Sequence, residues 1–167
     1  IFPWEVLPNI KEFIIKLGAV LDQNKFDNPQ ENVWIAKTAN RYDTAYLSGP
    51  CIIDEGAEVR HCAFIRGSVI IGKNAVVGNS TELKNCLLFD NVQVPHYNYV
   101  GDSVLGYKAH LGAGAITSNV KSDKTLVTVK QSETNTVLQT ELRKFGAVIG
   151  DNTEVGCNTV LLSLIHI

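Results

Sequence analysis

Aliphatic side chains recur at every sixth position through the middle of the chain: Leu47, Ile53, Val59, Ile65, Ile71, Val77, Leu83 and Phe89. A second column of small or β-branched residues lies four positions after most of them: Cys51, Ala57, Ala63, Val69, Ala75 and Thr81. An amphipathic helix would space its apolar residues by three and four, and a half-buried strand by two. Period six instead indicates a three-sided prism of short strands. Each side points one aliphatic residue inward, and stacked coils bury a continuous core.

Two interruptions break this period. After Phe89 the pattern resumes at Tyr99, Leu105 and Leu111, so we expect four residues to be looped out, with His96 in the loop. A second break runs from about 117 to 146, after which Ile149, Val155 and Leu161 restore the period. This insert contains the alternating segments TLVTVK and TNTVLQ around a polar turn, which predict a projecting β-hairpin. Loops that interrupt a rigid repeat are common places for function.

The flanking segments differ from the repeat. Apolar residues from Trp4 to Leu21 follow helical spacing and predict one amphipathic helix, which would cap the end of the prism or pack against a neighbouring subunit. The sequence DNPQEN reads as a linker, so residues 1–30 are expected to form a helix and linker, and 31–161 the β-helix domain. The last residues, LSLIHI (162–167), break the turn pattern and match a translated transposon end. We expect them to be a non-native read-through tail, so His166 is given no role.

Composition narrows the function classes. The 167 residues are 45% hydrophobic and 19% charged, with a formal net charge of −2, typical of one ordinary soluble domain. There is no basic run to bind nucleic acid and no apolar run of about 20 residues to cross a membrane, so we expect a cytoplasmic protein. The four cysteines lack Cys-x-x-Cys spacing and are expected to be reduced core or turn residues. No structural metal is predicted.

Three segments between Arg66 and Asn119 carry a family resemblance: VGNSTELK (77–84), PHYNYVGDSVLG (95–106) and LGAGAITSN (111–119). In order and spacing they resemble the acetyltransferase half of the bifunctional glucosamine-1-phosphate acetyltransferase and N-acetylglucosamine-1-phosphate uridyltransferase. The resemblance implies left-handed coils, a homotrimer, acetyl-CoA as donor and sites between subunits. The expected fold is therefore an all-β, left-handed parallel β-helix of hexapeptide repeats, with a short N-terminal helix and a hairpin-like insertion.

The same resemblance implies catalytic roles for His96 and Glu82. His96 would be the general base that takes a proton from the acceptor amine, a task that suits an imidazole because it titrates near neutral pH. The alternative is a surface-loop histidine without a role. Glu82 would orient His96 or the acceptor, or it is simply a surface charge.

Arg66 and Lys84 would hold the sugar phosphate, and the repeat supports this independently. Each directly follows an inward aliphatic residue, and the two are 18 positions apart, which is one coil of three six-residue sides. They should stack at one corner of adjacent coils, where like charges repel unless an anion lies between them. The alternative is a solvated pair on a polar edge. Tyr99 matches a sugar-contacting tyrosine, although its place in the aliphatic column equally predicts a core side chain.

The remaining matched positions bear on donor and acceptor. Ala113 and Asn119 match donor-side positions that meet the CoA arm. His110 stands where the amino-sugar enzymes carry asparagine, and Val120 where they carry tyrosine, so the identity of the acceptor stays open. His110 would contact a different sugar substituent or act as a second acid or base. No glycine-rich nucleotide-binding opening of the uridyltransferase type occurs.

Three functions are compatible with these features. The first is an acetyl-CoA-dependent acyltransferase acting on an amino-sugar phosphate or sugar nucleotide. The second is a non-catalytic trimerising or regulatory module associated with a sugar-1-phosphate nucleotidyltransferase. The third is a zinc hydratase that uses the same prism. It is disfavoured because His61, His96 and His110 lack the short paired spacing of such sites.

Overall fold

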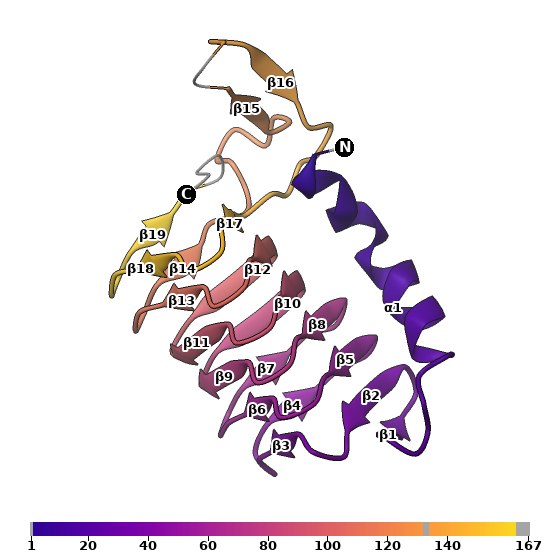
Figure 1. The fold of residues 1–167 in the computed structure, drawn as a ribbon. Helices are drawn as coiled ribbons and strands as arrows, with labels where there is room; N and C mark the ends of the chain where they lie inside the picture. The colour runs from indigo at the N-terminus through magenta and orange to yellow at the C-terminus, as the bar shows by residue number, and fades with distance from the viewer. Residues whose placement is uncertain (1, 132–133, 163–167) are drawn as a thin grey trace.

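The computed structural model describes residues 2–131 and 134–162 and forms a three-sided prism of stacked parallel coils (Figure 1). Before the insertion, successive coils pair through parallel strands that are 17 or 18 residues apart, as in Ile53 with Ile71 and Val77 with Val94. The predicted fold class, a mostly β-stranded parallel β-helix of hexapeptide repeats, is confirmed. Of the predicted read-through tail (162–167), residues 163–167 lie outside the described residues.

The prism has three faces, which we name A, B and C. Face A is built from β2 (Val33–Ala36), β5 (Cys51–Ile53), β8 (Val69–Ile71), the ends of β10 (Glu82–Leu88) and β12 (Tyr99–Leu105), and β17 (Val148–Ile149). Face B is built from β3 (Asn40–Arg41), β6 (Glu58–Val59), β9 (Val76–Asn79), β11 (Gln93–His96), β13 (His110–Leu111) and β18 (Glu154–Val155). Face C is built from β4 (Tyr46–Leu47), β7 (Phe64–Ile65), the beginnings of β10 and β12, β14 (Ile116–Thr117) and β19 (Val160–Leu161).

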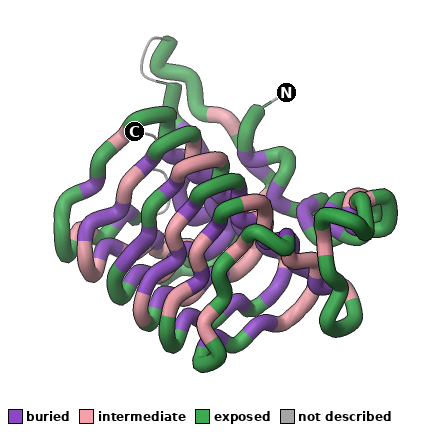
Figure 2. Tube along the Cα trace, turned by 60° about the horizontal axis from the view of Figure 1, so that its bottom comes forward, coloured by how far each residue is buried: buried purple, intermediate pink, exposed green. Residues whose placement is uncertain are grey.

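One inward side chain per side forms the core, as the period predicts. These residues are buried along the length of the prism, and buried segments alternate with exposed ones along each coil (Figure 2). Burial of each such Val, Leu or Ile side chain contributes about 1.5–3 kcal/mol. Stacking of the coils therefore supplies the stability that no single short strand could.

The predicted four-residue loop around His96 is wrong. Leu88 is 1% exposed and Phe89 52%, so Leu88 is the inward residue, and the next inward positions are Val94 and Val100. In β10 and β12 the chain turns from face C to face A with inward residues five apart instead of six, which shortens each of these coils by one residue. His96 consequently ends a regular strand, where it pairs with Asn79.

The N-terminal segment packs on the side of the prism. A 3₁₀-helix, η1 (Pro3–Asn9), leads directly into α1 (Ile10–Gly18). Trp4, Leu7, Ile10 and Ile14 are buried in a cluster that includes the outward Ile52 and Val104 of face A. Figure 1 shows the helix running along β5, β8, β10 and β12, so within this chain it covers a face of the prism and not its end. Within the described residues, no helix is long and apolar enough to span a bilayer.

Two further segments complete this face. The predicted linker is instead a strand, since β1 (Phe26–Gln30) pairs antiparallel with β2. The insertion contains the antiparallel strands β15 (Thr128–Lys130) and β16 (Val137–Gln139), which confirms the hairpin-like pairing. Val127, Val129 and Phe145 anchor the insertion in the same apolar cluster as the helix.

Candidate functional site on the two edges of face C

The edge where face C turns into face A carries the two predicted phosphate ligands. Arg66 follows Ile65 directly, and its backbone N–H donates to the carbonyl of Leu83, the residue before Lys84. The two cations therefore lie on adjacent coils at one corner, as their spacing of 18 predicts. We call this corner the C–A edge.

Each of these cations has a carboxylate partner. Arg66 Nη1 lies 2.7 Å from Glu82 Oε1, and Lys84 Nζ lies 3.3 Å from Asp102 Oδ2. Hydrogen bonding to Glu82 raises the pKa of the Arg66 guanidinium above its already high ordinary value. The like-charge repulsion foreseen between Arg66 and Lys84 is thus offset by two carboxylates of the chain itself. Glu82 contacts Arg66, and not His96.

Asp102 is the centre of this edge, and sequence reasoning assigned it no role. Its side chain is 6% exposed, and it accepts a hydrogen bond of 2.9 Å from the Asn85 amide as well as one from the Asn119 amide. The Asn119 amide also donates to the Tyr99 hydroxyl at 3.2 Å. The aspartate lies inside the YVGD segment that resembles the acetyltransferases, which was the available signal.

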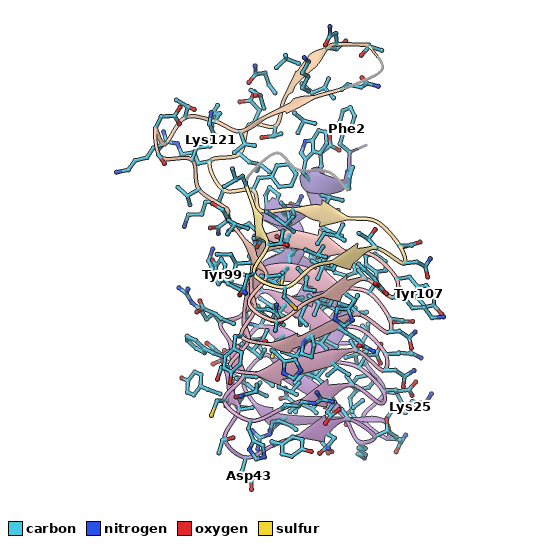
Figure 3. All side chains as sticks on the ribbon, turned by 90° about the vertical axis from the view of Figure 1, so that its left-hand side faces the viewer. Phe2, Lys25, Asp43, Tyr99, Tyr107 and Lys121 are labelled. Carbon is cyan, nitrogen blue, oxygen red and sulfur yellow. The ribbon has the colours of Figure 1, made fainter. Side chains whose placement is uncertain are left out.

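Tyr99 lies on the outer surface of face C, and the alternative of a core side chain is wrong because its neighbour Val100 is the inward residue. Figure 3 shows Tyr99 and Tyr107 on opposite sides of the prism. Partial burial raises the pKa of the Tyr99 hydroxyl, and the nearby Asp102 charge raises it further. Gly101 leaves room for the ring, since a Cβ there would lie 2.5 Å from the Tyr99 hydroxyl oxygen.

His96 lies at the opposite edge of face C, where face B turns into it, which we call the B–C edge. Its side chain is exposed, and among the described residues its imidazole makes no hydrogen bond or ion pair. The backbone here is well fixed. The His96 N–H donates to Asn98 Oδ1 at 3.1 Å, and the buried Asn98 amide donates to the carbonyls of Gly112 and Ala115.

The other predicted residues divide between the two edges and face B. Ala113 lies beside His96 on the next coil, since the following Gly114 N–H donates to the His96 carbonyl at 3.0 Å. Asn119 lies at the C–A edge, so the two donor-side positions are on opposite edges of face C. His110 is half-buried on face B, where it pairs with Gln93 and Glu154.

The histidines of the described residues do not form a cluster. His61 Nδ1 is 2.9 Å from the Thr44 hydroxyl and its ring packs on Tyr42, at a ring-centre distance of 4.4 Å. In the part of the chain that the structure describes, no three His, Cys, Asp or Glu side chains are placed to hold a metal ion. The arrangement can instead bind an anion at the C–A edge and move a proton at the B–C edge.

Comparison with known proteins agrees with the repeat and its motifs. Residues 47–165 match the model of the GMPPB C-terminal domain family. The chain is 33% identical over 162 residues to the bifunctional protein GlmU of Methanococcus vannielii, covering 96% of this chain and 38% of that protein. It is 35% identical over 111 residues to GlmU of Trichormus variabilis, covering 66% of this chain and 20% of the relative. It thus spans well under half of these relatives.

Among solved structures, a hexapeptide transferase family protein from Anaplasma phagocytophilum is similar, with a TM-score of 0.49 and 14% identity over 78% of this chain and 70% of that one. The perosamine N-acetyltransferase of Caulobacter crescentus gives a TM-score of 0.37 with 22% identity, covering 80% of this chain and 50% of that one. Because the family match covers most of its length, the chain belongs to the GMPPB C-terminal domain family, as a GlmU-like hexapeptide-repeat domain.

Proposed function

We propose that this domain transfers the acetyl group of acetyl-CoA to the amine of a sugar phosphate or sugar nucleotide. The observation that carries the proposal is the placement of Arg66 and Lys84 on adjacent coils, beside Tyr99 and Asn119. Two stacked cations flanked by a hydroxyl and an amide suit a phosphorylated sugar. The relatives named GlmU support acyl transfer to a sugar derivative.

In this proposal His96 is the general base. The acceptor nitrogen attacks the thioester carbonyl, the new N–C bond forms, and the C–S bond breaks. His96 takes the proton from the nitrogen, and this proton then neutralises the departing CoA thiolate. The exposed imidazole at the B–C edge suits this role because, among the described residues, it makes no hydrogen bond or ion pair.

Glu82 changes partner in this proposal. A phosphate at Arg66 would replace the Glu82 carboxylate, which is now 2.7 Å from the guanidinium. The released carboxylate would then be free to accept a hydrogen bond from the acceptor or from the His96 imidazole. His110 on face B would contact a further substituent of a long acceptor. Ala113 and Asn119 would lie beside the CoA arm.

A homotrimer in the cytoplasm is part of the proposal. In one chain both edges of face C lie open, with Glu82, Tyr99 and His96 at least partly accessible. A second and a third copy would enclose the ligands between subunits, which excludes water from the thioester.

A non-catalytic module is the second candidate, and one observation favours it. Both cations of the C–A edge are already neutralised by Glu82 and Asp102, which weakens the site for a phosphate. Such a module would bind ligand without transferring an acetyl group.

The test measures CoA-thiol release from acetyl-CoA over a panel of amino-sugar phosphates and amino-sugar nucleotides. His96→Ala should abolish release without changing the subunit number. His61→Ala is the matched control, because His61 is another histidine near the B–C edge, close to Thr44 and Tyr42. Full activity of His96→Ala would refute the base assignment, and absence of release with every acceptor would favour the module.

A further inference from the structure

Next to the C–A edge, face C carries two exposed aromatic side chains. Tyr46 is 65% exposed and Phe64 is 41% exposed, and they pair in register on adjacent coils. Their rings meet edge to face, with centroids 5.7 Å apart at 65°. Large aromatic groups that remain exposed as a pair are uncommon enough to need a reason.

This aromatic pair is continuous with the cationic site. The Arg66 guanidinium lies over the Phe64 ring, with its Cζ 5.9 Å from the ring centre. Both side chains leave the same strand on the outer side, because Ile65 between them is the inward residue. Lys84 and Glu82 follow on the next coil, and Tyr99 on the one after. Along face C the coil of Phe64 and Arg66 is therefore followed by the coil of Glu82 and Lys84, and then by the coil of Tyr99.

We infer that Tyr46 and Phe64 form a stacking platform for the base of a nucleoside diphosphate whose phosphates bind Arg66 and Lys84. A base stacks on aromatic rings whatever its hydrogen-bonding edge, and an adjacent guanidinium adds a cation–π contribution. Coils stack about 4.8 Å apart, so Phe64 and Tyr99, which are two coils apart, are separated by roughly 10 Å. With the base on the platform, the diphosphate would lie at Arg66 and Lys84, and the group attached to the diphosphate would lie beside Tyr99.

The inference deepens the proposed function and rests on its assignment of Arg66 and Lys84 to phosphate. A sugar 1-phosphate alone would leave the platform unused, whereas a nucleoside diphosphate fills it. Two substrates of the proposed reaction contain this group: an amino sugar linked to a nucleoside diphosphate, and CoA through its ADP portion. Both substrates contain a nucleoside diphosphate, and the experiment distinguishes which of them uses the platform.

The test is equilibrium binding of UDP and of inorganic pyrophosphate, measured by calorimetry in the absence of acetyl-CoA. The intact protein should bind UDP at least tenfold more tightly than pyrophosphate, since stacking contributes about 1–3 kcal/mol per base. Phe64→Ala should remove most of this advantage and leave pyrophosphate binding unchanged. Phe64→Trp should retain it, and Arg66→Ala should weaken both ligands.

Phe89→Ala is the matched control, because Phe89 is exposed but lies outside face C. The inference is overturned if the intact protein does not prefer UDP, if Phe64→Ala weakens pyrophosphate equally, or if that variant loses binding only by changing the subunit number. The titrations are then repeated with UDP-N-acetylglucosamine and with CoA. The compound whose affinity falls in Phe64→Ala is the one whose base stacks on the platform. Because no transfer is needed, preferred UDP binding without CoA-thiol release supports the platform and refutes the acetyltransferase.

Discussion

Asp102 and Asn119 are joined by a hydrogen bond from the amide of Asn119 to the carboxylate of Asp102, across adjacent coils of the C–A edge. The same carboxylate pairs with Lys84 and accepts from Asn85. Because Asn119 also donates to the Tyr99 hydroxyl, one nearly buried aspartate fixes a cation and, through an amide, a tyrosine. Asp102 is thus a positioning residue for the proposed site.

Asp102→Ala should lower the free energy of unfolding by about 2–4 kcal/mol, because it leaves Lys84 and two amides without their acceptor. Chemical denaturation checks this value. The matched control is Asp123→Ala, which removes an exposed carboxylate 3.7 Å from Lys121 and should destabilise the protein much less. Equal losses in the two variants would contradict the positioning role.

Tyr99→Phe tests the hydroxyl of the same network through pH. At pH 8 the variant should be about 1 kcal/mol less stable, because the hydrogen bond with Asn119 is lost. The folded pKa of Tyr99 is raised by burial, so above pH 10 the unfolded chain releases this proton first. The stability contributed by Tyr99 therefore falls as pH rises from its ordinary pKa through its folded pKa. Denaturation at pH 8 and pH 10.5 should show that the difference in free energy of unfolding between the unmodified protein and Tyr99→Phe becomes smaller at the higher pH. A difference that is constant with pH would argue against the raised pKa.

The period-six pattern was sufficient to predict the prism, because one inward side chain per side is a strict spatial requirement. It failed locally where a side shortens to five residues, since Leu88 and Phe89 are both apolar and the sequence does not say which one points inward. When two consecutive residues of a strand are both apolar, either one can point inward, and packing against the coils above and below determines which one does. That ambiguity produced the false loop at His96.

The repeat also made part of the candidate site predictable. Spacing placed Arg66 and Lys84 on adjacent coils, because the 18 residues between them make one full turn of three six-residue sides. Their carboxylate partners were not predictable from spacing alone, since Glu82 and Asp102 lie 16 and 18 residues from the cations they pair with. Which of several acidic side chains reaches a given cation depends on rotamer and on corner geometry.

The four cysteines should differ sharply in reactivity. Cys51 and Cys86 are buried, and burial raises the pKa of the Cys51 thiol to about 12 and that of Cys86 still further. Cys62 and Cys157 are exposed in turns. Since the thiolate is the reactive form, a thiol reagent should modify Cys62 and Cys157 quickly and the other two only after unfolding. Mass spectrometry of the labelled peptides checks the assignment, and rapid labelling of Cys86 in the native protein would contradict the core placement.

Phe145→Ala should uncouple the insertion from the N-terminal helix. The Phe145 ring is fully buried and lies 6.0 Å from the Trp4 ring, so its removal should cost about 3–5 kcal/mol. Urea denaturation followed by circular dichroism measures the loss, and tryptophan fluorescence reports on the Trp4 surroundings. Phe89→Ala, at an exposed aromatic, should change stability by less than about 1 kcal/mol. A small effect at Phe145 would mean that the insertion is not anchored there.

Gly78 lets β9 approach β11 closely, next to the proposed base. A Cβ at Gly78 would lie 1.5 Å from the carbonyl oxygen of Pro95, the residue before His96. Backbone atoms cannot yield as a flexible side chain can, so Gly78→Ala must push β11 away from β9. We expect a loss of about 3 kcal/mol or more in the free energy of unfolding, together with a fall in any His96-dependent acetyl transfer.

The chain provides a close control for this substitution. Gly156 directly follows the inward Val155, as Gly78 follows the inward Val77, but a Cβ there would meet only the Thr159 hydroxyl oxygen, at 3.8 Å. Gly156→Ala should therefore leave stability within about 1 kcal/mol of the unmodified protein, measured by thermal unfolding of both variants side by side. If the two alanines were equally tolerated, the approach of β9 to β11 would not be what holds His96 at the B–C edge. If only Gly78→Ala is damaging, and it impairs transfer more than it impairs sugar-phosphate binding, then the absence of a side chain at Gly78 is part of how the base is positioned.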